Sequence, residues 1–380
     1  MRSVRRPETR LFHIAALLFI STFGSLPARG AELRIGMFAD EFGIGADLGK
    51  DYIAGARTYF DHTNARGGIN GKKISLIVKD DGGDPANTVR LTREFIERDK
   101  VDLLFGYIGD EGVRAVSKDP VFNGAGIALY APLSGAEIGD GHDNIFFVRP
   151  SYRDEAKHVV QHFTLLGNTN FVTVATPSEL GTTLAVEISE QLKARGLKLA
   201  GKFGLATDLK GIDAVARNVL NAKAQVVVVA ADTIATAEFL KRVRALDKGT
   251  NVVAFSIVNH RTLMELAKPE FATGTMLTQV VPHPLASVTA VQSEHRALMA
   301  KYRDEPPSHL TLEGFLAAKG LVKALERAGR EPSRSAIVAA LSGEKRFDLG
   351  GIAIVFSSTS GRGSNFVDIA YLRKTGRLVQ

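Results

Sequence analysis

The sequence predicts an α/β protein built from two doubly wound lobes, each containing a parallel β-sheet. Apolar strand patterns alternate with amphipathic helix patterns along the chain, which is typical of βαβ units with right-handed crossovers. This alternation runs once to about residue 150 and begins again at Asp154. The segment 226–230 contains four consecutive valines, as expected for a parallel strand that is covered on both faces.

The first run of elements starts with an apolar segment, residues 33–39, that is expected to be a buried strand. Apolar residues then recur at helical spacing through about residue 65. Asp84 followed by Pro85 is typical of a helix N-cap and a first helical residue, so a helix is expected to begin there and to continue to residue 96. The remaining expected elements of this run are strands at 74–78, 103–106 and 127–131 and a helix at 111–122.

The second run repeats the alternation of helices and strands. Expected helices lie at 154–166, 182–195, 211–222 and 234–246, and expected strands at 171–175, 198–203, 226–230 and 252–256. The chain is then expected to form helices at 288–303, 311–328 and 333–341 and short strands at 352–356 and 366–373. Two such runs in 380 residues are long enough for two domains, each with its own core.

Composition excludes several classes of protein. The chain is 45% hydrophobic and 23% charged, which is typical of a folded protein. It contains no cysteine, so a disulfide scaffold, a thiolate nucleophile and a cysteine-bound metal are excluded.

The net charge is +7, but residues 1–30 contain five arginines and a single acidic residue, Glu8. Because over half of the net charge lies in that segment, nucleic acid is not an expected partner.

Residues 1–30 have the three parts of a secretory signal peptide. The first ten residues are basic, residues 11–26 are mostly apolar, and Ala28-Arg29-Gly30 offers small residues before a cut at Ala31. The alternative is a membrane anchor, for which the apolar run is short. No cysteine follows the cut, so a lipid anchor is not expected, and the mature chain is expected in the periplasm.

Several segments, in order, resemble the type I periplasmic solute-binding proteins of ABC importers, the leucine/isoleucine/valine-binding protein family. The resemblance begins with residues 59–82, YFDHTNARGGINGKKISLIVKDDG. It continues through FGY (105–107), APLSGAE (131–137), FFVRPSYRDE (146–155), EGFLAAKGLVKALERAG (313–329) and GSNFVDIAYLRKTGR (363–377). It implies two doubly wound lobes joined by three hinge crossings, near 149–151, 279–282 and 356–358. Lobe I would be 31–150 plus 282–356, and lobe II would be 151–281 plus 357–380.

The resemblance also implies a function. The protein would be the soluble, non-catalytic, substrate-binding component of an ABC importer, a monomer that closes on a small polar solute such as an amino acid or an amide and docks on membrane permease subunits. One alternative is an extracytoplasmic sensor that presents its ligand to a signalling receptor. Another is an exported enzyme on the same fold, because a fold does not by itself determine function.

The solute is expected beyond the carboxyl ends of the strands, where open parallel sheets bind their ligands. The family uses the same loops. The candidate ligand-binding residues in these loops are Asp40, Glu41, Phe42, Asp110, Glu111, Ser134, Gly135, Leu180, Asp232, Thr233, Ser256 and Asn259. Ser134 and Gly135 keep the family's carboxylate-binding loop, whereas Asp40–Gly43 and Asp110-Glu111 depart from its usual serine- or threonine-containing loops.

Acidic residues are frequent in these loops. They are Asp40, Glu41, Asp110, Glu111, Glu179 and Asp232. If they face the cleft, a cationic or polyhydroxyl ligand is favoured over a carboxylate, because like charges repel. The alternative is that Asp110 and Asp232 are helix N-caps and that the others face solvent.

No cofactor and no metal are expected. The glycines at 43, 45 and 49 follow a strand, but their GxGxxxG spacing differs from that of a dinucleotide-binding loop. His158 and His162 share one helix face without the glutamate of a zinc-binding motif, so they are interpreted as surface or half-buried residues. Arg149, Tyr152 and Asp154 are interpreted as residues that fix a crossing between the lobes.

Overall fold

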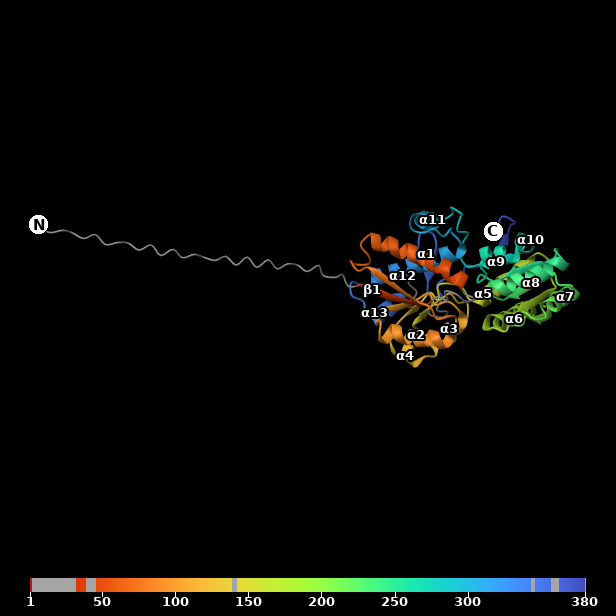
Figure 1. Ribbon diagram of the computed structural model, residues 1–380, viewed down its shortest axis with the longest axis horizontal. Coiled ribbons are helices and arrows are strands. Elements are labelled where there is room, and N and C mark those ends of the chain that lie inside the picture. Colours follow the sequence, from red (N-terminus) through yellow and green to blue (C-terminus); the bar gives the residue numbers. More distant parts are fainter. Residues whose placement is uncertain (2–31, 39–45, 139–141, 343–345, 357–361, 380) are drawn as a thin grey trace.

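A computed structural model describes residue 1 and residues 32–38, 46–138, 142–342, 346–356 and 362–379 of the chain. The segment 1–30, expected to be a signal peptide, therefore lies almost entirely outside the described residues. Two separate sheets organise the rest of the chain into two lobes that stand side by side (Figure 1). The expected α/β class and the two doubly wound lobes are confirmed.

The sheet of the first lobe has five strands in the order β2-β1-β3-β4-β5, and all of its pairs are parallel. Its strands are β1 (Leu33–Phe38), β2 (Ile74–Lys79), β3 (Leu103–Phe105), β4 (Leu129–Tyr130) and β5 (Ile145–Phe146). Side chains alternate between its two faces. Met37 and Phe105 enter one core and Phe38 and Leu104 enter the other, so both faces are buried.

Helices cover both faces of this sheet (Figure 1). The helices α1 (Ala46–Ala65), α11 (Ala290–Tyr302), α12 (His309–Ala328) and α13 (Arg334–Leu341) contribute to one core. The helices α2 (Pro85–Glu97), α3 (Asp110–Ser117) and α4 (Pro120–Gly124) contribute to the other. The hairpin of β11 (Arg346–Asp348) and β12 (Ala353–Val355) packs on the first of these cores. Segments 290–356 therefore return to the lobe in which the chain begins.

The second lobe has a seven-stranded sheet in the order β14-β13-β10-β9-β8-β6-β7. Its strands are β6 (Phe171–Ala175), β7 (Leu199–Gly204), β8 (Val226–Ala230), β9 (Asn251–Ala254), β10 (Met276–Gln279), β13 (Asp368–Leu372) and β14 (Leu378–Val379). Five strands are parallel, and β13 and β14 join antiparallel. The valines of β8 are fully buried and point alternately into two cores, as their unbroken run predicts.

The helices of the second lobe also lie on two faces of the sheet. One face carries α5 (Tyr152–Leu165) and α6 (Glu179–Lys193). The other carries α7 (Ile212–Asn221), α8 (Thr233–Leu246), α9 (His260–Ala267) and α10 (Pro269–Ala272). No helix among the described residues is both long enough and apolar enough to cross a bilayer.

Two expectations about single elements are wrong in detail. The helix expected at 111–122 is two helices, α3 and α4, because Pro120 starts a new helix with Asp119 as its N-cap. The strand expected at 127–131 is reduced to the two residues of β4. Asp84, in contrast, is the N-cap of α2 as expected, and its carboxylate accepts a hydrogen bond from the amide of Ala86 at 2.9 Å.

Two glycines allow α1 and α12 to pack against each other with backbone contacts. A Cβ atom on Gly55 would lie 1.9 Å from the carbonyl oxygen of Thr311, and one on Gly314 would lie 2.0 Å from the carbonyl oxygen of Tyr52. These distances are far below van der Waals contact. The two helices must therefore separate to accept any larger residue at either position.

We expect Gly55→Ala to lower the free energy of unfolding by about 1–3 kcal/mol or more, because the added methyl group overpacks this contact. Chemical denaturation monitored by circular dichroism measures the change. Gly124→Ala is the matched control, because nothing lies within 4 Å of the added Cβ atom and that glycine is in a helix. Equal stabilities for the two variants would show that the α1–α12 contact is not rigid.

Candidate functional site

Residues from both lobes meet in an interlobe seam, which lies at the positions where parallel sheets bind ligands. The first lobe contributes the beginnings of α1 and α3 and the loop after β4. The second lobe contributes the beginnings of α5, α6, α8 and α9. The interlobe seam is formed by Asp47, Asp51, Asp110, Arg114 and Ser134 from the first lobe and Tyr152, Glu179, Thr233, Asn259 and Arg261 from the second.

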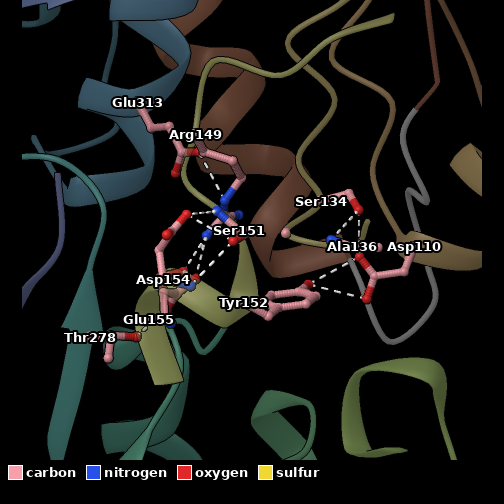
Figure 2. A network of polar contacts seen from close by, with 12 residues as sticks. Asp110, Ser134, Ala136, Arg149, Ser151, Tyr152, Asp154, Glu155, Thr278 and Glu313 are labelled. Carbon is pink, nitrogen blue, oxygen red and sulfur yellow. Dashed lines mark hydrogen bonds and ion pairs between the residues drawn. The ribbon is translucent and has the colours of Figure 1, made fainter. Parts of the chain in front are cut away.

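Asp110 occupies one end of the interlobe seam (Figure 2). The N-cap of α3 is Gly109, and Asp110 is the first residue of the helix, so its side chain does not cap that helix. Its Oδ1 atom accepts a hydrogen bond of 2.6 Å from the Ser134 hydroxyl, and both carboxylate oxygens lie within 3.1 Å of the Tyr152 hydroxyl, which donates to them. Among the described residues, no basic side chain forms an ion pair with Asp110. Burial raises its pKa, although the Ser134 and Tyr152 hydrogen bonds oppose that shift.

The loop after β4 is shaped to receive Tyr152. A Cβ atom on Gly135 would lie 2.5 Å from the Tyr152 ring, so this position admits only glycine without a rearrangement. The amide of Tyr152 donates a 2.9 Å hydrogen bond to the carbonyl of Gly135. Tyr152 is therefore held by its backbone while its hydroxyl reaches Asp110, and this links the first helix of the second lobe to the loop of the first.

The other end of the interlobe seam is centred on Asp47, in the first turn of α1. Its carboxylate accepts a 3.1 Å hydrogen bond from the Thr233 hydroxyl, and its carbonyl oxygen accepts one of 3.2 Å from the Asn259 side-chain amide. The backbone amide of Asn259 also donates to the Thr233 hydroxyl at 3.2 Å. Burial raises the pKa of Asp47, and the Thr233 hydrogen bond opposes that shift.

Two ion pairs at the seam connect the lobes. Arg114 of α3 pairs with Glu179 of α6, with a 2.7 Å hydrogen bond from its Nε atom. Arg261 of α9 pairs with Asp51 of α1, and the Ser308 hydroxyl donates a 2.7 Å hydrogen bond to the same carboxylate. The structure is therefore a closed arrangement in which polar side chains of the two lobes are in contact.

A buried charge network lies beside the seam, where the chain first crosses between the lobes (Figure 2). The Arg149 guanidinium is 1% exposed and lies 3.6 Å from a carboxylate oxygen of Glu155 and 3.6 Å from one of Glu313. Glu155 also accepts hydrogen bonds from Ser256 and from the hydroxyl of Thr278. Asp154 and Ser151 form a capping box at the start of α5. These contacts support the interpretation that Arg149 and Asp154 fix the crossing.

The predicted site residues fall into four groups. Asp110, Ser134, Gly135, Thr233 and Asn259 lie in or directly beside the interlobe seam. Three others have a structural role or face solvent. Leu180 packs in the core under α5 and α6, Asp232 caps α8 through the amide of Ala235 at 2.9 Å, and Glu111 is exposed. Ser256 belongs to the Arg149 network, and Asp40, Glu41 and Phe42 lie outside the described residues.

Sequence reasoning missed part of the seam. Asp47 and Arg261 lie in the first turns of α1 and α9, and Asp51 lies one turn further along α1, whereas the strand-end rule points only to the loops before those helices. Side chains in a first helical turn point toward the same edge of the sheet as the preceding loop. The strand-end rule extended to the first helical turn includes Asp47 and Arg261, but not Asp51.

The match to known proteins decides the family. A sequence profile described as periplasmic binding protein matches residues 32–377. The chain belongs to the periplasmic binding protein family. The match covers both lobes and confirms the expected resemblance to the leucine/isoleucine/valine-binding proteins, which are substrate-binding proteins and not enzymes.

Individual relatives of this periplasmic binding protein agree with that assignment. It is 24% identical to an "Amino acid binding protein" of Pseudomonas aeruginosa, with 85% of this chain and 86% of the relative covered. A solved substrate-binding periplasmic protein of Ralstonia solanacearum has a TM-score of 0.85 and 27% identity, covering 92% of this chain and all of the other.

A more distant relative shows the fold alone. The branched-chain amino acid transporter substrate-binding protein LivJ of Streptococcus pneumoniae, solved with isoleucine, has a TM-score of 0.80 and 19% identity, covering 92% and 98% of the two chains.

Proposed function

We propose that this periplasmic binding protein is exported to the periplasm and binds a small polar solute between its lobes for delivery to the permease subunits of an ABC importer. The observation that carries the proposal is the interlobe seam, in which first-turn and loop residues after parallel strands of both lobes face each other. Its relatives include proteins named for binding amino acids and for binding leucine, isoleucine and valine, which supports an amino-acid-like solute.

The charges of the seam suggest which part of the solute binds there. Asp47 and Asp110 accept hydrogen bonds from hydroxyl and amide groups, and neither has a basic partner among the described residues. Asp51, in contrast, is paired with Arg261. Two carboxylates without a countercharge favour a solute that presents an ammonium or amide N–H group to them, and they disfavour a carboxylate group at the same place.

The direct test is to identify the small molecule that co-purifies with the protein by mass spectrometry and to titrate that compound back by calorimetry. We expect saturable binding with a stoichiometry of one per chain, and no chemical conversion of the compound. The proposal is overturned if nothing co-purifies and no member of a panel of amino acids, amides and small amines binds.

We expect Asp110→Asn to weaken solute binding by about 10- to 100-fold while the protein stays folded. The variant retains an acceptor oxygen for Ser134 and Tyr152 but loses the charge, and a hydrogen bond to a charged group is worth about 1.5–3 kcal/mol. Calorimetry on the co-purifying compound measures the change. The control is Asp213→Asn, on an exposed part of α7. An unchanged affinity in Asp110→Asn would remove Asp110 from the site.

A further inference from the structure

Three histidine rings meet beside the interlobe seam. His260 is the first residue of α9 in the second lobe, His309 is the first residue of α12 in the first lobe, and His283 lies in the segment that runs from β10 to α11. The His309 ring contacts both of the others edge to face, with its centroid 6.2 Å from that of His260 and 5.6 Å from that of His283. This histidine cluster therefore contains a direct contact between the lobes.

His309 fits its surroundings only as a neutral ring. It is 7% exposed, and within the described residues neither Nδ1 nor Nε2 has a hydrogen-bond partner. An imidazolium would bring a charge and two N–H donors into a site without an acceptor, which is costly. Burial, with smaller contributions from His260 and His283, lowers the pKa of His309 well below its usual range.

The other two rings are constrained in the same direction. Burial lowers the pKa of His260 to about 4, and Arg261 and His283 add to that shift. The Nε2 atom of His283 lies 2.8 Å from the carbonyl oxygen of Leu378, so this nitrogen carries the hydrogen, and Nδ1 accepts a 3.2 Å hydrogen bond from the Leu285 amide. A second proton on His283, at Nδ1, would break the bond from Leu285.

The charged groups around the cluster do not favour a proton there either. Arg261 of α9 is positive and repels a charge on His260. The carboxylate of Asp51 on α1 is already paired with Arg261, and Glu305, in the segment before α12, adds negative charge near Asp51. From α11 the cluster receives an uncharged group, the Gln292 side-chain amide, which donates a 2.7 Å hydrogen bond to the His283 carbonyl oxygen. The closed arrangement is thus built around an unprotonated cluster.

We propose that the histidine cluster is an acid-sensitive switch, in which proton uptake favours separation of the lobes. Because His260 and His309 belong to different lobes, separation brings both rings into water, where an imidazolium forms readily. Acidification therefore favours the open arrangement, which binds the protons, over the closed one, which does not. Solute in the interlobe seam is then released more easily at acidic pH. This release, but not the opening itself, rests on the proposed function.

The distance between the lobes at two pH values tests the switch without any solute. Spin labels on Lys118→Cys, at the end of α3, and Val186→Cys, on α6, report that distance by double electron–electron resonance. If His260 titrates near pH 4 when the lobes are closed and near its usual 6.5 when they are open, the ratio of open to closed molecules rises at least about tenfold between pH 7.5 and 5.5. Longer distances should gain weight at pH 5.5, while circular dichroism shows that the chain stays folded. Identical distributions at the two pH values would overturn the proposal.

Histidine variants attribute the change to the cluster. His309→Phe keeps a ring that cannot be protonated, and His260→Gln removes the partner from the other lobe, so the test survives if one of them fails to fold. Each should show a smaller change with pH than the wild type, and the two together should abolish it. His162→Phe, in the last turn of α5 on the other face of the second sheet, is the matched control and should keep the full change.

The seam carboxylates do not produce the same result. Burial raises the pKa values of Asp47 and Asp110, so their protonation favours the closed arrangement and acts against the switch. The proposal is overturned if both single variants, His309→Phe and His260→Gln, open with acid as much as the wild type does. If the lobes open with acid as expected but no compound binds in the seam, the switch stands and the proposed function fails.

Discussion

Arg149→Met is expected to lower the free energy of unfolding by about 3–5 kcal/mol. The substitution removes the cation from a site in which Glu155 is completely buried and Glu313 nearly so. Burial by itself would lower the pKa of Arg149, but Glu313 and Glu155 raise it, so the guanidinium is charged at every pH at which the protein is folded. Its loss leaves buried negative charge without compensation. Chemical denaturation of the variant against the wild type measures the cost.

Two controls define the origin of this effect. Arg153→Met changes a neighbouring arginine whose side chain is 55% exposed, and it is expected to cost less than about 1 kcal/mol, as for other surface ion pairs. Adding Glu155→Gln and Glu313→Gln to Arg149→Met is expected to recover part of the loss, because the uncompensated charges are removed together. If Arg149→Met lowers the free energy of unfolding no more than Arg153→Met does, the Arg149 network does not stabilise the crossing between the lobes.

The second large effect is a loss of stability on acidification, caused by buried histidines. Burial lowers the pKa of His295 to about 3 and that of His260 to about 4. In the unfolded chain both residues take up a proton below about pH 6.5, whereas in the folded protein they do not until the pH is far lower. The contribution of these two histidines to the free energy of unfolding is therefore complete above pH 6.5. It decreases as the pH falls, by about 2 kcal/mol for each histidine at pH 5.

His295→Gln isolates this effect from that of other groups. His295 is completely buried between α11 and α12, and its Nε2 atom lies 3.1 Å from the Thr311 hydroxyl, a contact that glutamine can retain. The raised pKa of Glu313 has the opposite effect, because it makes the folded protein more stable as the pH falls. The measurement therefore compares the unfolding free energies of the variant and the wild type at each pH. We expect the slope of unfolding free energy against pH, between 6.5 and 5, to decrease by about 1.4 kcal/mol per unit. Parallel curves for the two proteins would contradict the expectation.

Local sequence patterns were sufficient where an element is long or chemically distinctive. The bounds of β6 and β8 agree with the strands expected at 171–175 and 226–230, because β-branched and apolar residues fill each of them. The strands β5, β10, β11 and β14 and the helices α9 and α10 were missed. β5 has two residues, and β10 carries polar Thr278 and Gln279 among its four, so neither shows a clear apolar run.

The candidate site was less predictable than the fold because its contacts are between distant parts of the chain. Asp110, Ser134, Thr233 and Asn259 could be found from the rule that ligands bind beyond strand ends. The sequence could not show which acidic residues would lack a basic partner. That depends on contacts between distant residues, such as Arg114 with Glu179 and Arg261 with Asp51. The boundaries of the two lobes within the chain stay a prediction.

We propose that the two lobes close on a solute that binds in the interlobe seam, and a distance across the seam tests this directly. The chain contains no cysteine, so Lys118→Cys at the end of α3 and Val186→Cys on α6 allow a spin label to be attached to each lobe. Double electron–electron resonance then measures the distance across the seam with and without the compound that co-purifies with the protein. We expect the compound to shorten and narrow the distance distribution, and we expect the Asp110→Asn variant to need a higher concentration of the compound for the same change. If a saturating concentration of the compound leaves the distribution unchanged, the lobes do not close on a solute in the seam.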